Sequence, residues 1–174
     1  MYEDLLTQAA SLAQLDPKKP KQANLRRAVS SAYYAVFHYL VHEACCVQIG
    51  TQHNQAAYRH VLGRAFSHTV MNQACRSFGG GTLKDAAIKG LPRNPAGNYV
   101  IPNEIQDIAK TFVELQEKRH LADYDLTERF RRSDVLALIQ QVQSDVEQFA
   151  TLAPSDDRRF FLACLWAWKE LTTR

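Results

Sequence analysis

Apolar residues recur at steps of three and four along most of the chain, and this spacing predicts amphipathic α-helices. A long helix is expected over residues 22–48, with one continuous buried stripe: Leu25, Val29, Ala32, Val36, Leu40, Ala44 and Val47. A shorter helix is predicted over residues 2–15, with these residues on its inner face: Leu5, Ala9, Leu12 and Leu15. The proline-containing segment 16–20 ends this first helix, because proline has no amide hydrogen to donate.

Four further helices are predicted downstream. One covers about residues 52–78, with a break expected near residues 63–67, and the next begins at Asn103 and runs to about residue 122. Asn103 is the expected cap of that helix, with Gln106 at the reciprocal capping-box position. The last two span about residues 133–152, capped by Ser133 or Asp134, and about residues 154–171. The fold class is therefore predicted to be all-α, an up-down helical bundle.

The length of 174 residues predicts a single domain, with its core within about residues 22–150. The C-terminal helical segment, residues 151–174, is too rich in Phe and Trp to stay in water, so it packs on the bundle or forms a dimer interface. Residues 79–102 hold five of the seven glycines and form the one long loop candidate, with a single helical turn expected at 85–89.

Composition narrows the class of protein. Apolar residues make up 46% of the chain, enough for a normal core, and a net charge of +3 is too small to argue nucleic-acid binding by itself. No membrane span and no signal peptide are recognisable. Four cysteines without CxxC spacing read as reduced thiols, so we expect no disulfide, no bound metal, no cofactor and a cytoplasmic location.

The long helix predicted over residues 22–48 also carries a polar stripe of residues four apart. It consists of Arg26, Ser30, Tyr34, His38 and His42, with Arg27 and Ser31 nearly equivalent in position. A guanidinium, hydroxyls, a phenol and imidazoles together can bind phosphate and move protons. The alternative is a structural one, in which the stripe is a hydrogen-bonded seam between helices.

A second candidate cluster lies at residues 119–124. Arg119 and Asp123 are four apart, as are His120 and Tyr124, so each pair can meet on one helix face. An arginine fixed by a carboxylate beside an imidazole suits phosphodiester chemistry, whereas the structural alternative is an Arg–Asp pair that anchors the helix. The basic residues that follow could extend a phosphate-binding surface: Arg129, Arg131 and Arg132.

These two segments resemble the signatures of HEPN-domain proteins. Residues 25–38, LRRAVSSAYYAVFH, are similar to the long first core helix of that family, and residues 119–124, RHLADY, are similar to its second signature. The resemblance covers roughly residues 22–150 and points to the small, free-standing bacterial members. It implies a bundle of four to five helices, usually a homodimer, that binds RNA or a nucleotide.

Many HEPN proteins are metal-independent ribonucleases of toxin–antitoxin or phage-defence systems. The resemblance implies catalytic roles for Arg119 and His120, supported by Asp123 and Tyr124. The two leading residues are adjacent here, whereas the family motif separates them by four to six residues, so on a helix they point about 100° apart. A non-catalytic interaction module, partnering an antitoxin or a nucleotidyltransferase-like protein, is the alternative function.

Overall fold

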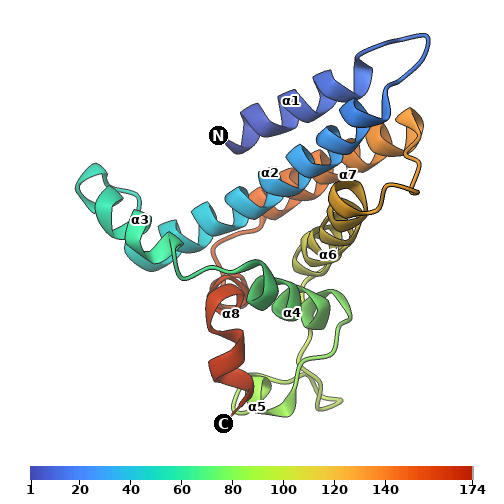
Figure 1. Ribbon diagram of the computed structural model, residues 1–174. Helices are drawn as coiled ribbons and strands as arrows, with labels where there is room; N and C mark the ends of the chain where they lie inside the picture. Colours follow the sequence, from blue (N-terminus) through green and yellow to red (C-terminus); the bar gives the residue numbers. More distant parts are fainter. Residues whose placement is uncertain (174) are drawn as a thin grey trace. The chain divides into compact units, whose positions relative to one another are not determined.

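A computed structural model describes residues 1–173 of the chain, and over these residues the secondary structure is helical, without strands (Figure 1). The helices are α1 (Tyr2–Gln14), α2 (Gln22–Ile49), α3 (Ala56–Gly63), α4 (His68–Gly79), α5 (Asp85–Ile88), α6 (Asn103–Tyr124), α7 (Arg132–Thr151) and α8 (Asp156–Thr172), with a short 3-10 turn at His53–Gln55. The predicted all-α helical bundle is confirmed. No helix in the described part combines the length and the hydropathy needed to cross a membrane.

The chain packs as two compact units. The first contains Met1–Tyr39 and Thr111–Ala150, and the second contains Leu40–Lys110 and the segment from Thr151 onward. Helices α2 and α6 therefore contribute one part to each unit. The candidate site residues of both predicted clusters, except His42, belong to the first unit.

The first unit is an up-down bundle of α1, the first part of α2, the second part of α6, and α7. Tyr2 lies against Tyr39, with ring centroids 5.0 Å apart, and the Ser31 hydroxyl donates to the Gln8 side chain at 3.1 Å. Early residues of α1 thus meet late residues of this part of α2, so the two helices run antiparallel. The buried core draws on all four elements: Leu6, Ala9, Leu25, Val29, Val36, Phe112, Leu115, Val142 and Phe149.

The same reasoning orients α6 and α7. Arg26 reaches the carbonyl of Ala122, while Tyr33 packs on Phe112, so α6 runs antiparallel to α2. Thr111 donates its hydroxyl hydrogen to the buried carboxylate of Asp145, and the end of α6 is only a short loop from the start of α7. Helix α7 is therefore antiparallel to α6, which completes an up-down order of four.

Helix α1 corrects one predicted face. Leu6, Ala9 and Ala13 are its buried residues, whereas Leu15 follows the helix and is exposed. Both sets of positions satisfy a three-to-four spacing, so periodicity alone did not separate them.

Two arginines close the C-terminal ends of helices in this bundle. Arg26 donates from its two Nη atoms to four carbonyls at the end of α6 and in the following loop: Leu121, Ala122, Asp125 and Glu128, at 2.6–3.3 Å. Arg132 donates to four carbonyls at and beyond the end of α1: Ala13, Leu15, Asp16 and Pro17, at 2.7–3.0 Å. The last carbonyls of a helix have no partner within it, so these guanidinium groups satisfy them.

The second unit contains the rest of α2 and α6 together with α3, α4, α5 and α8. Phe78 of α4 packs on the α8 residues Phe161 and Trp168, with ring centroids 4.9 and 6.1 Å apart. Ser155 caps α8 by accepting a hydrogen bond from the amide of Arg158 at 3.1 Å, close to the predicted start. The single turn expected in the 79–102 loop is present as α5.

The expected break near residues 63–67 is confirmed, and it divides the predicted 52–78 helix into α3 and α4.

Two helix starts in the chain differ from prediction. The Asn103 capping box is wrong: Pro102 supplies the first accepting carbonyl, and the Gln106 side chain donates to the carbonyl of Ile101. Helix α7 begins at Arg132, before the expected caps Ser133 and Asp134, and the Ser133 hydroxyl donates to Asp134.

Replacing Arg26 with Ala should lower the free energy of unfolding by about 2–3 kcal/mol, because several carbonyls lose a charged donor together. Urea unfolding followed by circular dichroism measures this change. Arg27→Ala is the matched control, since Arg27 is the exposed neighbour on the same helix, and it should shift stability by no more than about 0.5 kcal/mol. Equal effects of the two substitutions would contradict a clamping role for Arg26.

Candidate anion-binding site

The carboxylate of Asp123 joins α2 to α6 within the first unit. Its Oδ1 accepts a hydrogen bond from the buried Ser30 hydroxyl at 2.7 Å, and its Oδ2 accepts one from Nε of Arg119 at 2.9 Å. Arg119 and Asp123 are one turn apart on α6, as their spacing predicted. Because Ser30 comes from the other helix, the pair is fixed both along α6 and across the bundle.

Two aromatic rings hold the guanidinium of Arg119. Its Cζ lies 5.3 Å from the ring centroid of Tyr33 and 5.0 Å from that of Tyr34, within the range of cation–π attraction. Tyr33 is fully buried and itself packs on Phe112, so one ring of the pair is rigid. The Arg119 side chain is therefore held in position although it is 20% exposed.

The hydrogen-bonding capacity of Arg119 is only partly used. Nε donates to Asp123, while the two Nη groups have no hydrogen-bond partner within residues 1–173. A positioned guanidinium with both Nη groups available matches the bidentate geometry by which arginine binds phosphate or carboxylate. The arrangement can therefore bind one anionic group at the surface of the bundle.

His38 continues this cluster along α2. Its ring is stacked at 27° on Tyr34, with centroids 6.3 Å apart, and meets Phe37 edge-on at 5.4 Å. Burial lowers the pKa of His38 below its ordinary value, and the positive amino terminus of the chain lowers it further. The imidazole is thus neutral at pH 7 and able to accept a proton.

His120 and Tyr124 form a separate pair on α6. Their ring centroids are 5.0 Å apart, and both side chains are exposed. His120 follows Arg119 directly and points about 100° away around the helix, so it packs on Tyr124 rather than on the tyrosines that hold Arg119. The structure brings Ser30, Tyr34, His38, Arg119 and Asp123 into one chain of contacts and leaves His120 outside it.

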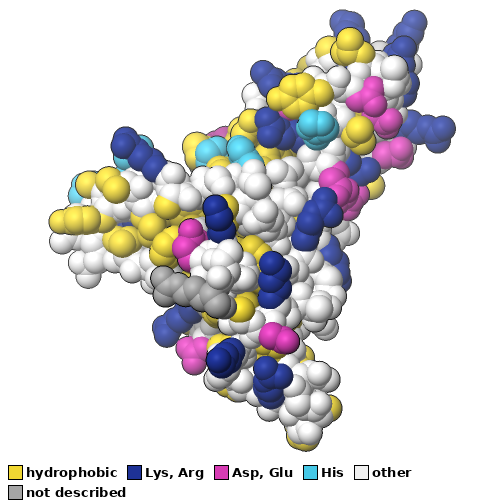
Figure 2. All heavy atoms as spheres, turned by 60° about the horizontal axis from the view of Figure 1, so that its bottom comes forward, with side chains coloured by type: hydrophobic (Ala, Val, Ile, Leu, Met, Phe, Trp, Pro, Cys, Tyr) yellow, Lys and Arg dark blue, Asp and Glu magenta, His cyan; other side chains and the backbone are white. Residues whose placement is uncertain are grey.

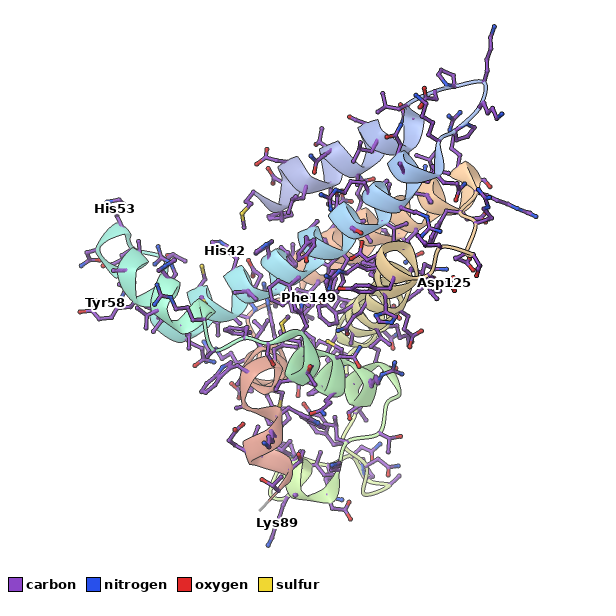
Figure 3. All side chains as sticks on the ribbon, viewed as in Figure 1. His42, His53, Tyr58, Lys89, Asp125 and Phe149 are labelled. Carbon is purple, nitrogen blue, oxygen red and sulfur yellow. The ribbon has the colours of Figure 1, made fainter. Side chains whose placement is uncertain are left out.

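The remaining predicted binding residues divide into two groups. Arg26 and Arg132 donate to backbone carbonyls and serve the fold. Arg27, Arg129 and Arg131 are exposed, and Arg129 lines a surface pocket together with the lysines of the loop between α1 and α2. Figure 3 labels Asp125 near the end of α6, where the segment that carries Arg129 and Arg131 begins.

Tyr33 is the site residue that sequence reasoning left out. The adjacent tyrosines of residues 33–34 were the available signal, since two neighbouring rings on one helix can flank a cation from another helix. Tyr33 falls outside the four-residue spacing of the polar stripe of α2, and for that reason the spacing did not indicate it.

All four cysteines are free, and within the described residues no three His, Cys, Asp or Glu side chains are grouped so as to hold a metal ion. Burial raises the pKa of the Cys164 thiol to about 12, which keeps it protonated.

Comparison with known proteins does not identify the chain. No family model, no curated protein and no solved structure matches it.

Asp123→Ala should lower the free energy of unfolding by about 1–2 kcal/mol, because it leaves the buried Ser30 hydroxyl without its acceptor and Arg119 without its anchor. Chemical denaturation measures the change. Glu114→Ala is the control on the same helix: the Glu114–Lys118 pair has the same spacing but is 54% and 41% exposed, so its loss should cost no more than about 0.5 kcal/mol. An unchanged free energy of unfolding of the Asp123 variant would refute a stabilising link from Asp123 to Ser30 and Arg119.

His38 should make stability depend on pH in a defined direction. Its folded pKa lies below the unfolded value of 6.5, so between the two the unfolded chain binds more protons. The free energy of unfolding should therefore fall as the pH drops from about 6.5 towards the folded pKa. Unfolding curves at several pH values should show a shallower fall for His38→Gln than for wild type, and parallel profiles would be inconsistent with a depressed pKa.

Proposed function

We propose that this protein binds RNA through a backbone phosphate held by the two Nη groups of Arg119. The observation that carries the proposal is a guanidinium fixed by Asp123 and two tyrosine rings, with both Nη groups available to an anion. Tyr34 lies beside this phosphate position and can stack on a base or a ribose, since base–aromatic stacking is a general device of single-strand binding.

The resemblance to HEPN-domain proteins supports this choice of anion. The two segments that carry the resemblance lie on antiparallel helices of one bundle, and Ser30 of the first is hydrogen-bonded to Asp123 of the second. We propose accordingly an HEPN-like, cytoplasmic protein that acts as a homodimer. The four free thiols fit a reducing compartment.

A second step, metal-independent cleavage, is favoured by the neutral imidazole of His38. In this reaction His38 takes the proton of a ribose 2′-hydroxyl, the 2′-oxygen bonds to phosphorus, and the bond to the 5′-oxygen breaks as that oxygen takes a proton from solvent. Arg119 neutralises the charge that develops on the phosphoryl oxygens. The residues of this proposal differ from the sequence prediction in two respects. His38 replaces His120 as the base, and Tyr124, which packs on His120, takes no part.

The test uses a short, fluorescently labelled single-stranded RNA in EDTA. Fluorescence anisotropy at low salt should show binding that weakens about tenfold or more in Arg119→Ala and also in Arg119→Lys, because lysine cannot form the bidentate contact. Gel analysis of the same mixtures should show cleavage by wild type and by His120→Ala, and none by His38→Ala or Arg119→Ala.

Arg27→Ala is the control for a general loss of positive charge. It should reduce the affinity for RNA only slightly, at every salt concentration tested. Equal weakening by Arg27→Ala and Arg119→Ala would contradict the proposed site. Binding that depends on Arg119 without any cleavage would retain the RNA-binding proposal and remove the nuclease step, and no binding at all would favour a non-catalytic interaction module.

A further inference from the structure

Helix α3, in the second unit, turns its apolar side towards solvent. None of its residues is buried, and Tyr58 and Val61 are 66% and 63% exposed. The opposite side faces α2, since a Cβ placed on Gly63 would lie 3.7 Å from Val41. At about 100° per residue, Ala57, Tyr58 and Val61 all point about 120–160° away from Gly63. Figure 3 shows Tyr58 extending outward from α3.

This arrangement reverses the usual amphipathic pattern. A surface helix normally buries its apolar stripe and exposes its charges. An eight-residue helix is too short to be stable by itself, and Arg59, in the middle of α3, ties it to the preceding segment by donating to the carbonyls of Gly50 and Gln52 at 2.7 and 3.0 Å. Its outer face is therefore an apolar surface without a covering element in the described chain.

The charged side chains of α3 and its two ends are basic. Arg59, Arg64, His53 and His60 lie on α3 or next to it, and the sequence has no Asp or Glu between Ala44 and Lys84. Glu43 of α2, close to the α2 residue that faces α3, is paired with Arg158 at 2.6 Å. Figure 2 shows hydrophobic side chains gathered over α3 at the left edge of the view, with basic and histidine side chains beside them and no acidic ones at its tip. An occupant of this face must supply negative charge around an apolar centre.

We propose that the outer face of α3 docks an acidic amphipathic helix of a partner protein. The apolar residues Ala57, Tyr58 and Val61 are spaced as a ridge that fits the groove of a second helix, and Arg64 lies at its border to pair with a carboxylate. A face-to-face contact with a second copy would bring two positive surfaces together. Nucleic acid would use the charge and Tyr58, but Val61 and Ala57 give a base nothing to stack on.

The probe is a synthetic 21-residue peptide of three heptads, with Leu at positions a and d and Glu at e and g, so that repulsion keeps it monomeric. A second peptide carries Lys in place of every Glu. Binding of each labelled peptide to the full-length protein is measured by fluorescence anisotropy. The Glu peptide should bind wild type, and the Lys peptide should not, because only the former complements the charge around α3.

Three variants locate the contact. Tyr58→Ser combined with Val61→Ser should weaken the Glu peptide at least about tenfold, and Arg64→Glu should weaken it several-fold. Leu126→Ser is the control, since it removes an apolar side chain of the other unit that is even more exposed, at 86%, and it should leave affinity unchanged. Circular dichroism confirms folding, which exposed substitutions should preserve.

Four outcomes would overturn the proposal. In the first, the Glu and Lys peptides bind equally well or neither binds. In the second, the double variant binds the Glu peptide as tightly as wild type does. In the third, sedimentation shows that the double variant dissociates a dimer of the wild type, which assigns the face to self-association. In the fourth, the double variant loses single-stranded RNA binding, which assigns it to nucleic acid.

Discussion

The last carbonyls of an α-helix have no hydrogen-bond donor within the helix. In the first unit of this protein, two arginines from other helices donate hydrogen bonds to such carbonyls. Arg26 of α2 donates to carbonyls at the end of α6 and in the loop that follows it, and Arg132 of α7 donates to carbonyls at the end of α1 and just beyond it. Each guanidinium serves four carbonyls, so removing either would leave several polar groups unsatisfied at once. The bundle depends on these two contacts because they fix where its helices end and where the connecting loops turn.

The same constraint separates structural arginines from the one that can bind a ligand. Arg26 and Arg119 both lie between α2 and α6, yet they have different partners. Arg26 donates to backbone oxygens, which a ligand cannot displace without opening the helix end. Arg119 uses only Nε, on the Asp123 carboxylate, and the rings of Tyr33 and Tyr34 hold its guanidinium without using its Nη groups. A cation fixed in this way needs little reorganisation to bind a phosphate.

Local spacing predicted much of this arrangement. The Arg119–Asp123 pair and the buried stripe of α2 follow from residues three and four apart, and the structure has both, the stripe as far as Ala44. Val47, the last residue predicted for the stripe, is 39% exposed, because it lies near the end of α2, where less of the chain packs against the helix. The inner face of α1 was missed because two sets of positions satisfy the same periodicity. The Asn103 cap was missed because Pro102, just before it, supplies the carbonyl that opens α6.

Partners far apart in sequence could not be predicted in this way. The carbonyls that receive Arg26 and Arg132 lie about a hundred residues from them, and so does the Ser30 hydroxyl that meets Asp123. Nothing in their local sequence distinguishes Arg26 from Arg27, although one is a clamp and the other is exposed. Tertiary packing makes that distinction, and it also moves the candidate imidazole from His120, next to Arg119 in sequence, to His38, linked to it through Tyr34.

The most direct measurement is NMR of the arginine guanidinium groups in protein labelled with ¹⁵N-arginine, during titration with a short single-stranded RNA. The Nη signals of Arg119 should shift and sharpen as RNA binds, because a phosphate restricts their rotation, while the signals of Arg26 and Arg132 stay in place. Unchanged Arg119 signals at saturating RNA, or shifts confined to the exposed arginines, would contradict the binding of RNA through Arg119.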